Sequence, residues 1–229
     1  MWDRREENIM ERRRQFLKKG ATLLGGLLVW MTPLSTVVGK AFAEAKKIIL
    51  PKGTARETLI DKNPALLDTR NLDPVPLESF GTMGLSDHEV DLHQWRLEVA
   101  GRVKNPLRLT LEALKALPPT ERNVLLICPG FFANYGTWRG VSVRELLEKA
   151  RAEEGVTQVT VRGPQGKYSM VKDFKIEDVY SDKIFLAYEV NGKTLPRRHG
   201  FPLRLVAEGY YGYDWVKYVH NVTVEKIQR

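Results

Sequence analysis

Residues 186–206 carry the sequence LAYEVNGKTLPRRHGFPLRLV, which combines a hairpin with a following strand. Asn191-Gly192 stands between apolar segments at 184–190 and 194–195, and this dipeptide is the strongest short signal for a tight turn between antiparallel strands. The segment from Pro202 to Val206 predicts a further strand. We therefore expect a β-sheet in this part of the chain.

The rest of the chain predicts further strands and short helices around this stretch. Apolar and polar residues alternate over 95–99 and 156–162, which indicates half-buried strands, and the last strand is expected within 216–227. Two short helices are expected, over 111–117 and from Ser142 to about Ala152. The predicted fold is a single strand-rich domain of the α+β class.

Composition excludes several classes of protein. The chain has 229 residues, a single cysteine and four histidines, so it has neither a disulfide framework nor a cysteine-rich metal site. It has no glycine-rich phosphate loop and no internal repeat. Half of the net charge of +8 lies in residues 1–43, which argues against a nucleic-acid-binding protein.

Residues 1–43 have the features of an export signal. Arg13-Arg14 precedes Phe16-Leu17-Lys18, a mildly apolar run follows, and Ala41-Phe42-Ala43 provides a cleavage site. The basic segment resembles the twin-arginine (Tat) signal, so we expect Tat export and a periplasmic location. An uncleaved N-terminal anchor helix is the alternative. Residues 44–90 are rich in charges and prolines and predict an extended arm that precedes a domain over 91–229.

Cys128 is the first candidate for chemistry. It follows a continuous apolar run at 124–127, which predicts a buried strand, and it precedes Pro129-Gly130, where the backbone can approach a ligand closely. It is also the only thiol of a chain that we expect to be exported. A thiolate is a soft ligand suited to a transition metal. A buried structural cysteine is the alternative.

The stretch at 186–206 resembles the signature segment of the sulfite oxidase and methionine-sulfoxide reductase family of molybdopterin-dependent oxidoreductases. Tyr211-Gly212 and Trp215-Val216-Lys217 continue this resemblance, and Cys128 with Trp138-Arg139-Gly140-Val141 is similar to the family's metal-ligand segment. The resemblance covers about 80–224. It implies a strand-rich fold of the sulfite oxidase molybdopterin-binding type over 91–229, with molybdopterin (the molybdenum cofactor) as the bound group.

The family resemblance also implies roles for individual residues. Cys128 would be the protein ligand of molybdenum, while Arg204 and Lys217 would bind the cofactor's phosphate. His199 would donate a hydrogen bond to the cofactor, and backbone amides near Trp215 and Val216 would complete an anion-binding cradle. Arg204 and Lys217 could instead be ordinary strand residues, and His199 could be a turn residue.

Three further residues are weaker candidates. Tyr168 aligns loosely with the family's active-site tyrosine, which donates a hydrogen bond near the metal's oxo group; a strand aromatic packed on the core is the alternative. Arg162 and Arg139 could hold an anionic substrate, an idea that rests on spacing alone.

The resemblance implies a molybdenum-dependent oxidoreductase that transfers an oxygen atom, with two electrons, to or from a small oxyanion or sulfoxide. No haem-binding domain is recognised in the chain, so we expect a separate electron-transfer protein, such as a membrane haem protein or a soluble cytochrome, as its partner. One alternative is an exported binding or accessory module of the same fold without molybdenum. Another is a metal-free thiol enzyme that uses Cys128 as its nucleophile.

Overall fold

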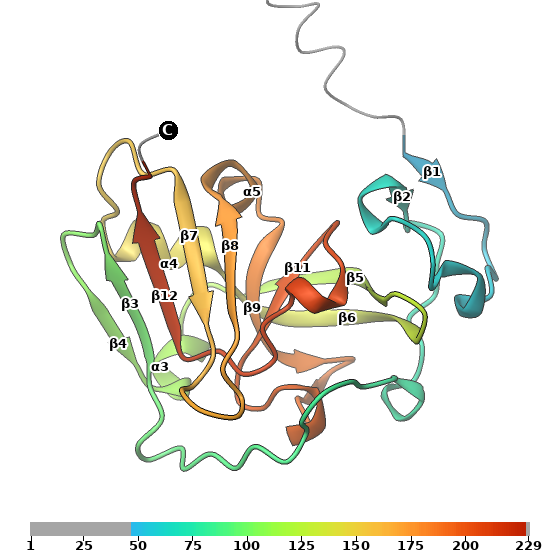
Figure 1. Cartoon of the computed structure of the whole chain (residues 1–229), viewed down its shortest axis with the longest axis horizontal. Helices are drawn as coiled ribbons and strands as arrows, with labels where there is room; N and C mark the ends of the chain where they lie inside the picture. Colours follow the sequence, from blue (N-terminus) through green and yellow to red (C-terminus); the bar gives the residue numbers. More distant parts are fainter. Residues whose placement is uncertain (1–46, 228–229) are drawn as a thin grey trace, which may run out of the picture. The chain divides into compact units, whose positions relative to one another are not determined.

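Two five-stranded sheets form the framework of the protein in this computed structural model, which describes residues 47–227 (Figure 1). In Figure 1 the strands of the first sheet run vertically, and β5 and β6 of the second sheet lie across them. The predicted Tat signal peptide over 1–43 lies outside the described residues.

The first sheet has the strand order β4-β3-β12-β7-β8. Its pairs are antiparallel except for the parallel pair of β3 and β12. Buried and exposed residues alternate along β3 and β12, as expected for strands with one face on the core. The strand bounds are β3 Leu97–Gly101, β4 Leu107–Leu109, β7 Gln158–Arg162, β8 Val171–Lys175 and β12 Asn221–Glu225.

The second sheet has the order β10-β9-β6-β5, with β11 also paired to β9. Its central strand β9 is buried along nearly its whole length, which explains its continuous apolar sequence. The hairpin predicted at Asn191-Gly192 joins β9 to β10. The bounds are β5 Thr120–Cys128, β6 Phe132–Ser142, β9 Ile184–Val190, β10 Lys193–Thr194 and β11 Arg204–Ala207.

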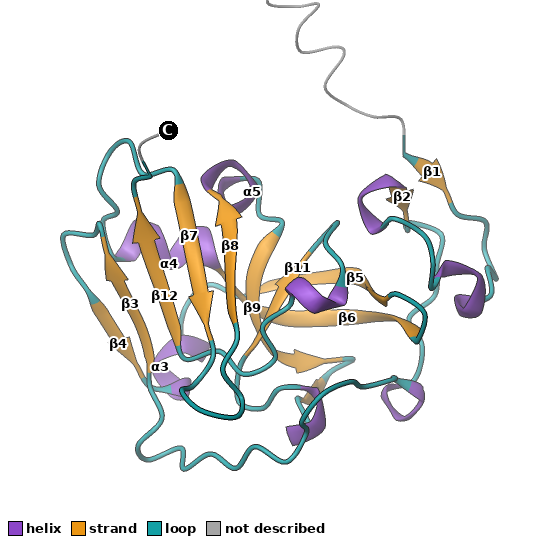
Figure 2. Cartoon of the chain, in the orientation of Figure 1, coloured by secondary structure: helices purple, strands orange, loops and turns teal. Residues whose placement is uncertain are grey.

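Three short α-helices connect these strands, as Figure 2 shows: α3 Leu111–Lys115, α4 Val143–Lys149 and α5 Ile176–Tyr180. The side chains of Thr110 and Ser142 accept hydrogen bonds from the first turns of α3 and α4, as their sequences predict. Helix α5 contacts β7 and β8 of the first sheet and β9 of the second, so it joins the two sheets.

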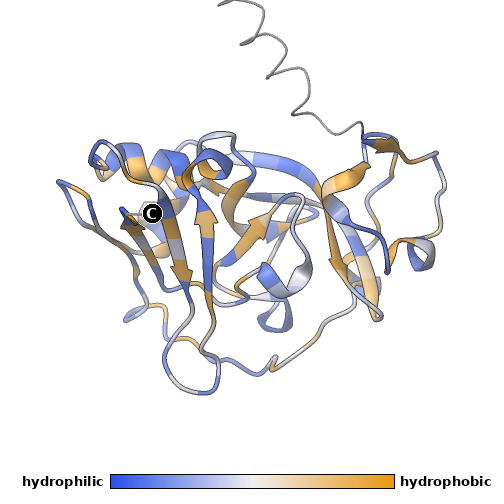
Figure 3. Cartoon of the chain, turned by 45° about the horizontal axis from the view of Figure 1, so that its top comes forward, coloured by the Kyte–Doolittle hydropathy of each residue, from blue (hydrophilic) through white to orange (hydrophobic). Residues whose placement is uncertain are grey.

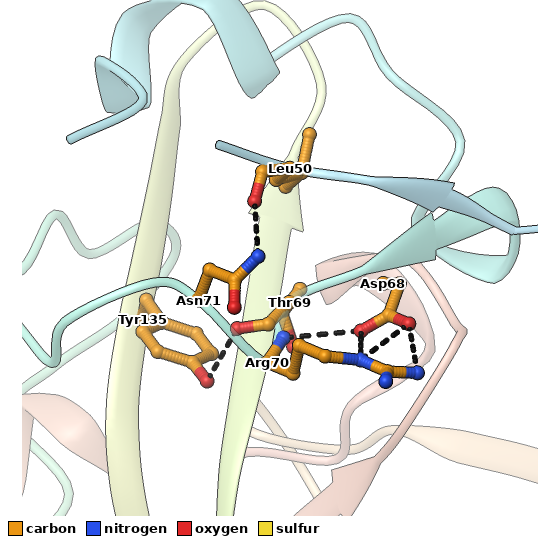
Figure 4. A network of polar contacts seen from close by, with 6 residues as sticks. All are labelled: Leu50, Asp68, Thr69, Arg70, Asn71 and Tyr135. Carbon is orange, nitrogen blue, oxygen red and sulfur yellow. Dashed lines mark hydrogen bonds and ion pairs between the residues drawn. The ribbon is translucent and has the colours of Figure 1, made fainter. Parts of the chain in front are cut away.

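Residues 47–96 form an irregular segment with a hydrophobic cluster of its own against β5 and β6. It contains the strands β1 Ile48–Ile49 and β2 Leu67–Asp68 and the 3₁₀ helices η1 Arg56–Leu59, η2 Pro64–Leu66 and η3 Leu77–Ser79. Leu59 packs with Leu125 and Ile127 of β5. The Tyr135 hydroxyl of β6 donates to the carbonyl of Thr69 (3.0 Å), and Asn71 donates to the carbonyl of Leu50 (Figure 4).

The main core lies between and around the two sheets. Trp138 and Trp215 are among its largest buried side chains, and their rings meet edge to face with centroids 5.7 Å apart. Hydrophobic residues concentrate on the strands, whereas the short helices and loops at the periphery are mostly hydrophilic (Figure 3). Within residues 47–227, no helix has the length and apolar character needed to cross a membrane.

One element differs in extent from its prediction, and two elements were not predicted. The last strand covers only 221–225 of the predicted 216–227, because residues 216–220 run along the core without regular pairing. β8 and α5 were not predicted: β8 carries lysines at both Lys172 and Lys175, and α5 is too short to show a helical period.

Gly140 of β6 should not tolerate a side chain. It follows a register shift between β6 and β9, and a Cβ added there would overlap the carbonyl of Leu186 and lie 2.6 Å from the Cα of Ala187. We expect Gly140→Ala to lower the free energy of unfolding by about 2–3 kcal/mol, because backbone must move to admit the methyl group. Urea denaturation measures this change.

Gly192→Ala is the matched control for Gly140→Ala. Gly192 has a φ of 70°, and the space that an added methyl group would occupy is open, so its substitution carries only the left-handed backbone penalty of about 1–2 kcal/mol. A loss at Gly140 no larger than the loss at Gly192 would contradict the steric argument.

Candidate functional site

A cavity of about 180 Å³ lies where the end of β5, the arm and the C-terminal loops meet, and we call it the Cys128 pocket. Its walls are largely apolar, with a few polar groups among them. Its lining comprises Phe80, Gly81, Thr82, Met83, Gly84, Leu126, Cys128, Phe132, Asn134, Trp138, Met170, His199, Arg204, Gly212, Tyr213, Trp215 and Lys217.

Cys128 is the last residue of β5, and its buried thiol opens onto this cavity. The apolar run before it is buried at every position from Val124, which places the strand end against the core as predicted. Its Sγ lies 3.6 Å from the Sδ of Met83 on the arm. Burial raises the pKa of the Cys128 thiol, and the positive charge of Arg204 opposes this rise.

Arg204 begins β11 and is only 7% exposed. Its Nη1 donates to the carbonyl of His199 (3.1 Å), and its guanidinium lies 5.7 Å from the ring centroids of both Trp138 and Trp215. None of the described carboxylates pairs with it, and its buried Nε has no hydrogen-bond partner among residues 47–227. Burial lowers its pKa to about 10. A buried cation without an acid calls for an anionic ligand.

His199 ends the 3₁₀ helix η4 Arg197–His199 and is 2% exposed. Its Nε2 is buried and finds no partner within the described chain. Burial, with the charges of Arg198, Arg204 and Lys217, lowers its pKa to about 4, so the imidazole is neutral near pH 7. A neutral imidazole can donate or accept one hydrogen bond at this free atom.

Lys217 lines the cavity and makes contacts with the arm that were not predicted. Its Nζ donates to Thr82 Oγ1 (3.3 Å), the Met83 carbonyl (2.6 Å) and the Leu85 carbonyl (3.1 Å). These contacts hold residues 81–87, which we call the strap, against the C-terminal loops. Burial and the charge of Arg204 lower its pKa to about 8. In this geometry the ammonium has all three of its donors directed at the strap.

Asn134 of β6 secures the other end of the strap. Its side chain accepts from the amide of Gly81 (2.9 Å) and donates to the carbonyl of the same residue (2.9 Å). Asn134 is buried and lines the cavity, yet it was not predicted as a site residue. In the register of the two strands, Asn134 of β6 pairs with Leu126 of β5. Its hydrogen-bond partner Gly81 is 53 residues away in sequence, so no local pattern could have indicated this contact.

Of the other predicted residues, Trp215 lines the cavity, whereas Val216 and Tyr168 lie outside its lining. Trp215 lines the cavity, but its backbone amide donates to the carbonyl of Gly212 (3.2 Å) and its indole to the carbonyl of Tyr210. Val216 is fully buried beside it and accepts from the amide of Leu205 through its carbonyl. Tyr168 lines an adjoining hollow, where its hydroxyl donates to Asp87 (2.7 Å).

The two arginines considered for an anionic substrate do not reach the pocket. Arg139 of β6 pairs with the carboxylates of its cross-strand neighbours, Glu121 on β5 and Glu189 on β9. Arg162 lines a separate cleft on the first sheet and contacts Thr223 and Glu225. Their spacing in the sequence did not indicate a place in the pocket, because both arginines lie on strands where acidic neighbours pair with them.

The donor set of the pocket fits an anionic organic group that carries a metal with affinity for sulfur. The fit rests on the buried guanidinium without an acid, the free Nε2 of His199 and a thiol at the cavity wall. At Gly212 the backbone lies close to β5, since a Cβ added there would lie 3.1 Å from the carbonyl oxygen of Ile127. Within residues 47–227 no three His, Cys, Asp or Glu side chains gather into a metal site, so a metal would need ligands from the bound group itself.

Acid should destabilise the fold through His199. Its folded-state pKa of about 4 lies below its ordinary value, so the unfolded chain binds more protons between these values, and stability is lost as pH falls from about 6.5 towards 4. We expect His199→Gln to reduce the loss of stability in cofactor-free protein between about pH 7 and pH 5. Urea denaturation at both pH values measures the slope. His93→Gln at an exposed position is the control, and an unchanged slope in His199→Gln would contradict the prediction.

Comparison with known proteins identifies the fold and its relatives. The model of the oxidoreductase molybdopterin binding domain family matches residues 84–229. An uncharacterized oxidoreductase of Bacillus subtilis, YuiH, is 30% identical over 137 residues, which cover 59% of this chain and 68% of YuiH. The NADH nitrate reductase of Lotus japonicus is 29% identical over 191 residues, which cover 70% of this chain but 21% of that protein.

A solved structure agrees with the family match. The sulfane dehydrogenase SoxCD from Paracoccus pantotrophus superposes with a TM-score of 0.58 at 24% identity, covering 65% of this chain and 45% of the SoxCD chain. This similarity concerns the fold. The chain spans about a fifth of the length of the nitrate reductases that it matches.

Proposed function

The chain belongs to the oxidoreductase molybdopterin binding domain family, and from this premise we propose that it is an exported enzyme that transfers oxygen atoms at a molybdenum centre. Molybdopterin is the cofactor of this family. The proposed reaction removes oxygen from a small oxyanion or sulfoxide. The substrate takes up two electrons and two protons and yields the reduced compound and water; the reverse reaction takes the oxygen from water. Electrons pass to or from a separate redox protein, one at a time.

The observation that carries this proposal is the buried Arg204 guanidinium in the same cavity as the chain's only cysteine. When bound, the cofactor supplies the two-electron redox chemistry of molybdenum, which no side chain provides. Cys128 would hold the metal as a thiolate. Metal coordination favours the deprotonated thiol, which offsets the pKa rise caused by burial.

Arg204 would bind the negatively charged end of the cofactor. Its planar fork suits a phosphate, and the pairing would compensate a buried charge that has no acid within residues 47–227. The free Nε2 of His199 would hydrogen-bond the same group, and the neutral imidazole adds no further charge. Lys217 would act mainly by holding the strap that forms one wall of the cavity.

Trp215 would form part of the cavity wall, packed edge to face on Trp138 beside the guanidinium, while the fully buried Val216 would support it from outside the lining. Tyr168 would act at the entrance to the site, since its hydroxyl is committed to Asp87 in the adjoining hollow. The proposed periplasmic location rests on the twin-arginine motif at Arg13-Arg14 in the sequence.

Metal analysis of the full chain tests the proposal. Protein made with its leader in molybdenum-replete cells should contain molybdenum in stoichiometric amount relative to the protein. It should also turn over a small oxyanion or sulfoxide with an artificial electron carrier. Folded protein that lacks molybdenum would instead support the binding or accessory module. Alkylation separates the thiol-enzyme alternative: Cys128 should be protected in loaded protein and become reactive once the cofactor is removed, whereas a nucleophilic thiol would react in both states.

A further inference from the structure

We propose that a cleft at one end of the first sheet, separate from the Cys128 pocket, binds a small organic carboxylate through Trp95, His88 and His220. We call it the sheet cleft, and Arg162 on its wall would supply the positive charge. The proposal goes beyond the proposed function, because none of these four residues lines the Cys128 pocket.

The sheet cleft lies where the ends of three neighbouring strands meet. Its volume is about 760 Å³. Trp95 precedes β3, His220 precedes β12, and Arg162 ends β7. The amide of His220 donates to the carbonyl of Arg162 (2.9 Å), and the amide of Glu98 donates to the carbonyl of His220 (3.0 Å). This end of the sheet lies on the lower side of Figure 1, where the segment that carries His88 runs below the strands.

Three ring nitrogens beside this cleft lack hydrogen-bond partners. Trp95 Nε1, His88 Nε2 and His220 Nε2 are all buried, and none has a partner within residues 47–227. Trp95 is only 4% exposed. The ring centroid of His220 lies 5.9 Å from that of His88 and 6.0 Å from that of Trp95. Because a buried polar atom without a partner costs free energy, three of them around one cleft indicate a ligand that supplies acceptors.

These nitrogens offer hydrogen-bond donors without a permanent charge. The indole of Trp95 can only donate, and a neutral imidazole can donate from Nε2. Burial, together with the charge of His88, lowers the pKa of His220 to about 4, and burial lowers the pKa of His88, so both rings are neutral near pH 7. A metal is a poor alternative, because within the described chain no third His, Cys, Asp or Glu joins these histidines in a metal site.

Arg162 provides a guanidinium with donors to spare. Its Nη1 donates to the Thr223 hydroxyl (2.9 Å), whereas its Nη2 lies 3.8 Å from the Glu225 carboxylate, which is too far for a hydrogen bond. The planar fork therefore keeps N–H groups for a planar carboxylate. Arg162 was considered from the sequence for an anionic substrate, and in the sheet cleft it would hold an anion of a different kind.

Acidic residues on the cleft favour a ligand with a single negative charge. Glu89 is paired with Arg197 (2.8 Å), and Glu98 lies 3.7 Å from Arg108. Both carboxylates line the cleft and would repel a dianion such as sulfate more strongly than a monoanion. A carboxylate brings one charge and two oxygens that can accept from several donors, and the volume leaves room for its organic body.

Isothermal titration calorimetry of the full chain near pH 7 tests the proposal. Benzoate should bind with a Kd of about 1 mM or tighter. Its uncharged analogue benzamide should bind at least about tenfold more weakly, and so should sulfate. No measurable binding of benzoate would leave the three nitrogens to buried water and overturn the proposal. Equal affinity for benzoate and benzamide, or for benzoate and sulfate, would contradict the carboxylate assignment.

Two variants remove single contacts. Trp95→Phe keeps an aromatic ring but loses the N–H group, and Arg162→Met loses the charge without disturbing the core. Each should weaken benzoate binding by at least about tenfold. Arg102→Met is the matched control, because Arg102 also lies on the first sheet's side of the chain but pairs with Glu153 and does not line the cleft. Wild-type affinity in either test variant, or an equal loss in the control, would contradict the proposed contacts.

Two further titrations exclude other sites. Arg204→Met should bind benzoate like the wild type; a loss of binding there would move the ligand to the Cys128 pocket and sink the proposal. Zn²⁺ should not bind more tightly than benzoate, and tight Zn²⁺ binding that His220→Gln abolishes would assign the imidazoles to a metal instead. None of these outcomes bears on the proposed function, which is tested by molybdenum content and by turnover.

Discussion

Cys128→Ser should eliminate turnover while leaving the fold intact. A serine hydroxyl has nearly the shape of the thiol but is a hard and weakly acidic donor, so it would not replace a thiolate on molybdenum. We expect kcat to fall by more than the roughly 10–100-fold that loss of a supporting contact around a metal costs. The visible absorption of the loaded protein should change as well, since sulfur-to-metal charge transfer is lost. Steady-state kinetics and absorption spectra measure both effects.

Phe131→Ser is the matched control for Cys128→Ser. Phe131 lies in the same turn between β5 and β6 and is 69% exposed, outside the cavity lining. It should keep the spectrum and at least most of the activity. A Cys128→Ser variant with normal spectrum and turnover would remove Cys128 from the ligand role and leave it as a packed core residue.

The sequence predicted the fold and the site best where a short local pattern, such as an apolar run or a turn, stands beside residues with a chemical role. The apolar run before Cys128 predicts a buried strand, and β5 does end at that residue. The turn at Asn191-Gly192 predicts the hairpin that joins β9 and β10. Arg204 and His199 were predicted from the family resemblance of one stretch, and both line the same cavity.

Contacts between distant segments could not be predicted in this way. Asn134 recognises Gly81 through two hydrogen bonds, and Met83 reaches Cys128 across 45 residues of sequence. Neither residue stands in a recognisable motif. The position of the arm depends on contacts with β5, because its hydrophobic cluster packs on Leu125 and Ile127. Lys217 shows the same limit: its contacts on the strap were not predicted, and its phosphate contact stays a prediction.

The electrostatics of the pocket connect the fold to the proposed chemistry. β11 places Arg204 opposite Ala187 of β9, so the guanidinium is desolvated between two tryptophans instead of lying on a surface. In the cofactor-free chain this arrangement costs free energy, because the buried charge lacks an acid. An anionic cofactor that pairs with Arg204 would recover that cost, so binding and folding should be coupled.

Arg204→Met should separate these two effects. Methionine fills similar volume without a charge, so cofactor-free protein should be equally or more stable to urea than the wild type. The content of molybdenum and pterin in protein purified from molybdenum-replete cells should fall by about 10–100-fold, since the phosphate loses its buried partner.

Arg204→Lys is the informative companion of this variant. It keeps a positive charge but loses the planar fork, so cofactor content should be intermediate between the wild type and Arg204→Met. Arg122→Met serves as the control, because Arg122 is engaged with Glu208 and lies outside the pocket. If Arg204→Met kept wild-type cofactor content, the phosphate contact would have to lie elsewhere. If it instead lost stability in the empty chain, the guanidinium would be a structural element of the core, held by its bond to the His199 carbonyl and its two tryptophan neighbours.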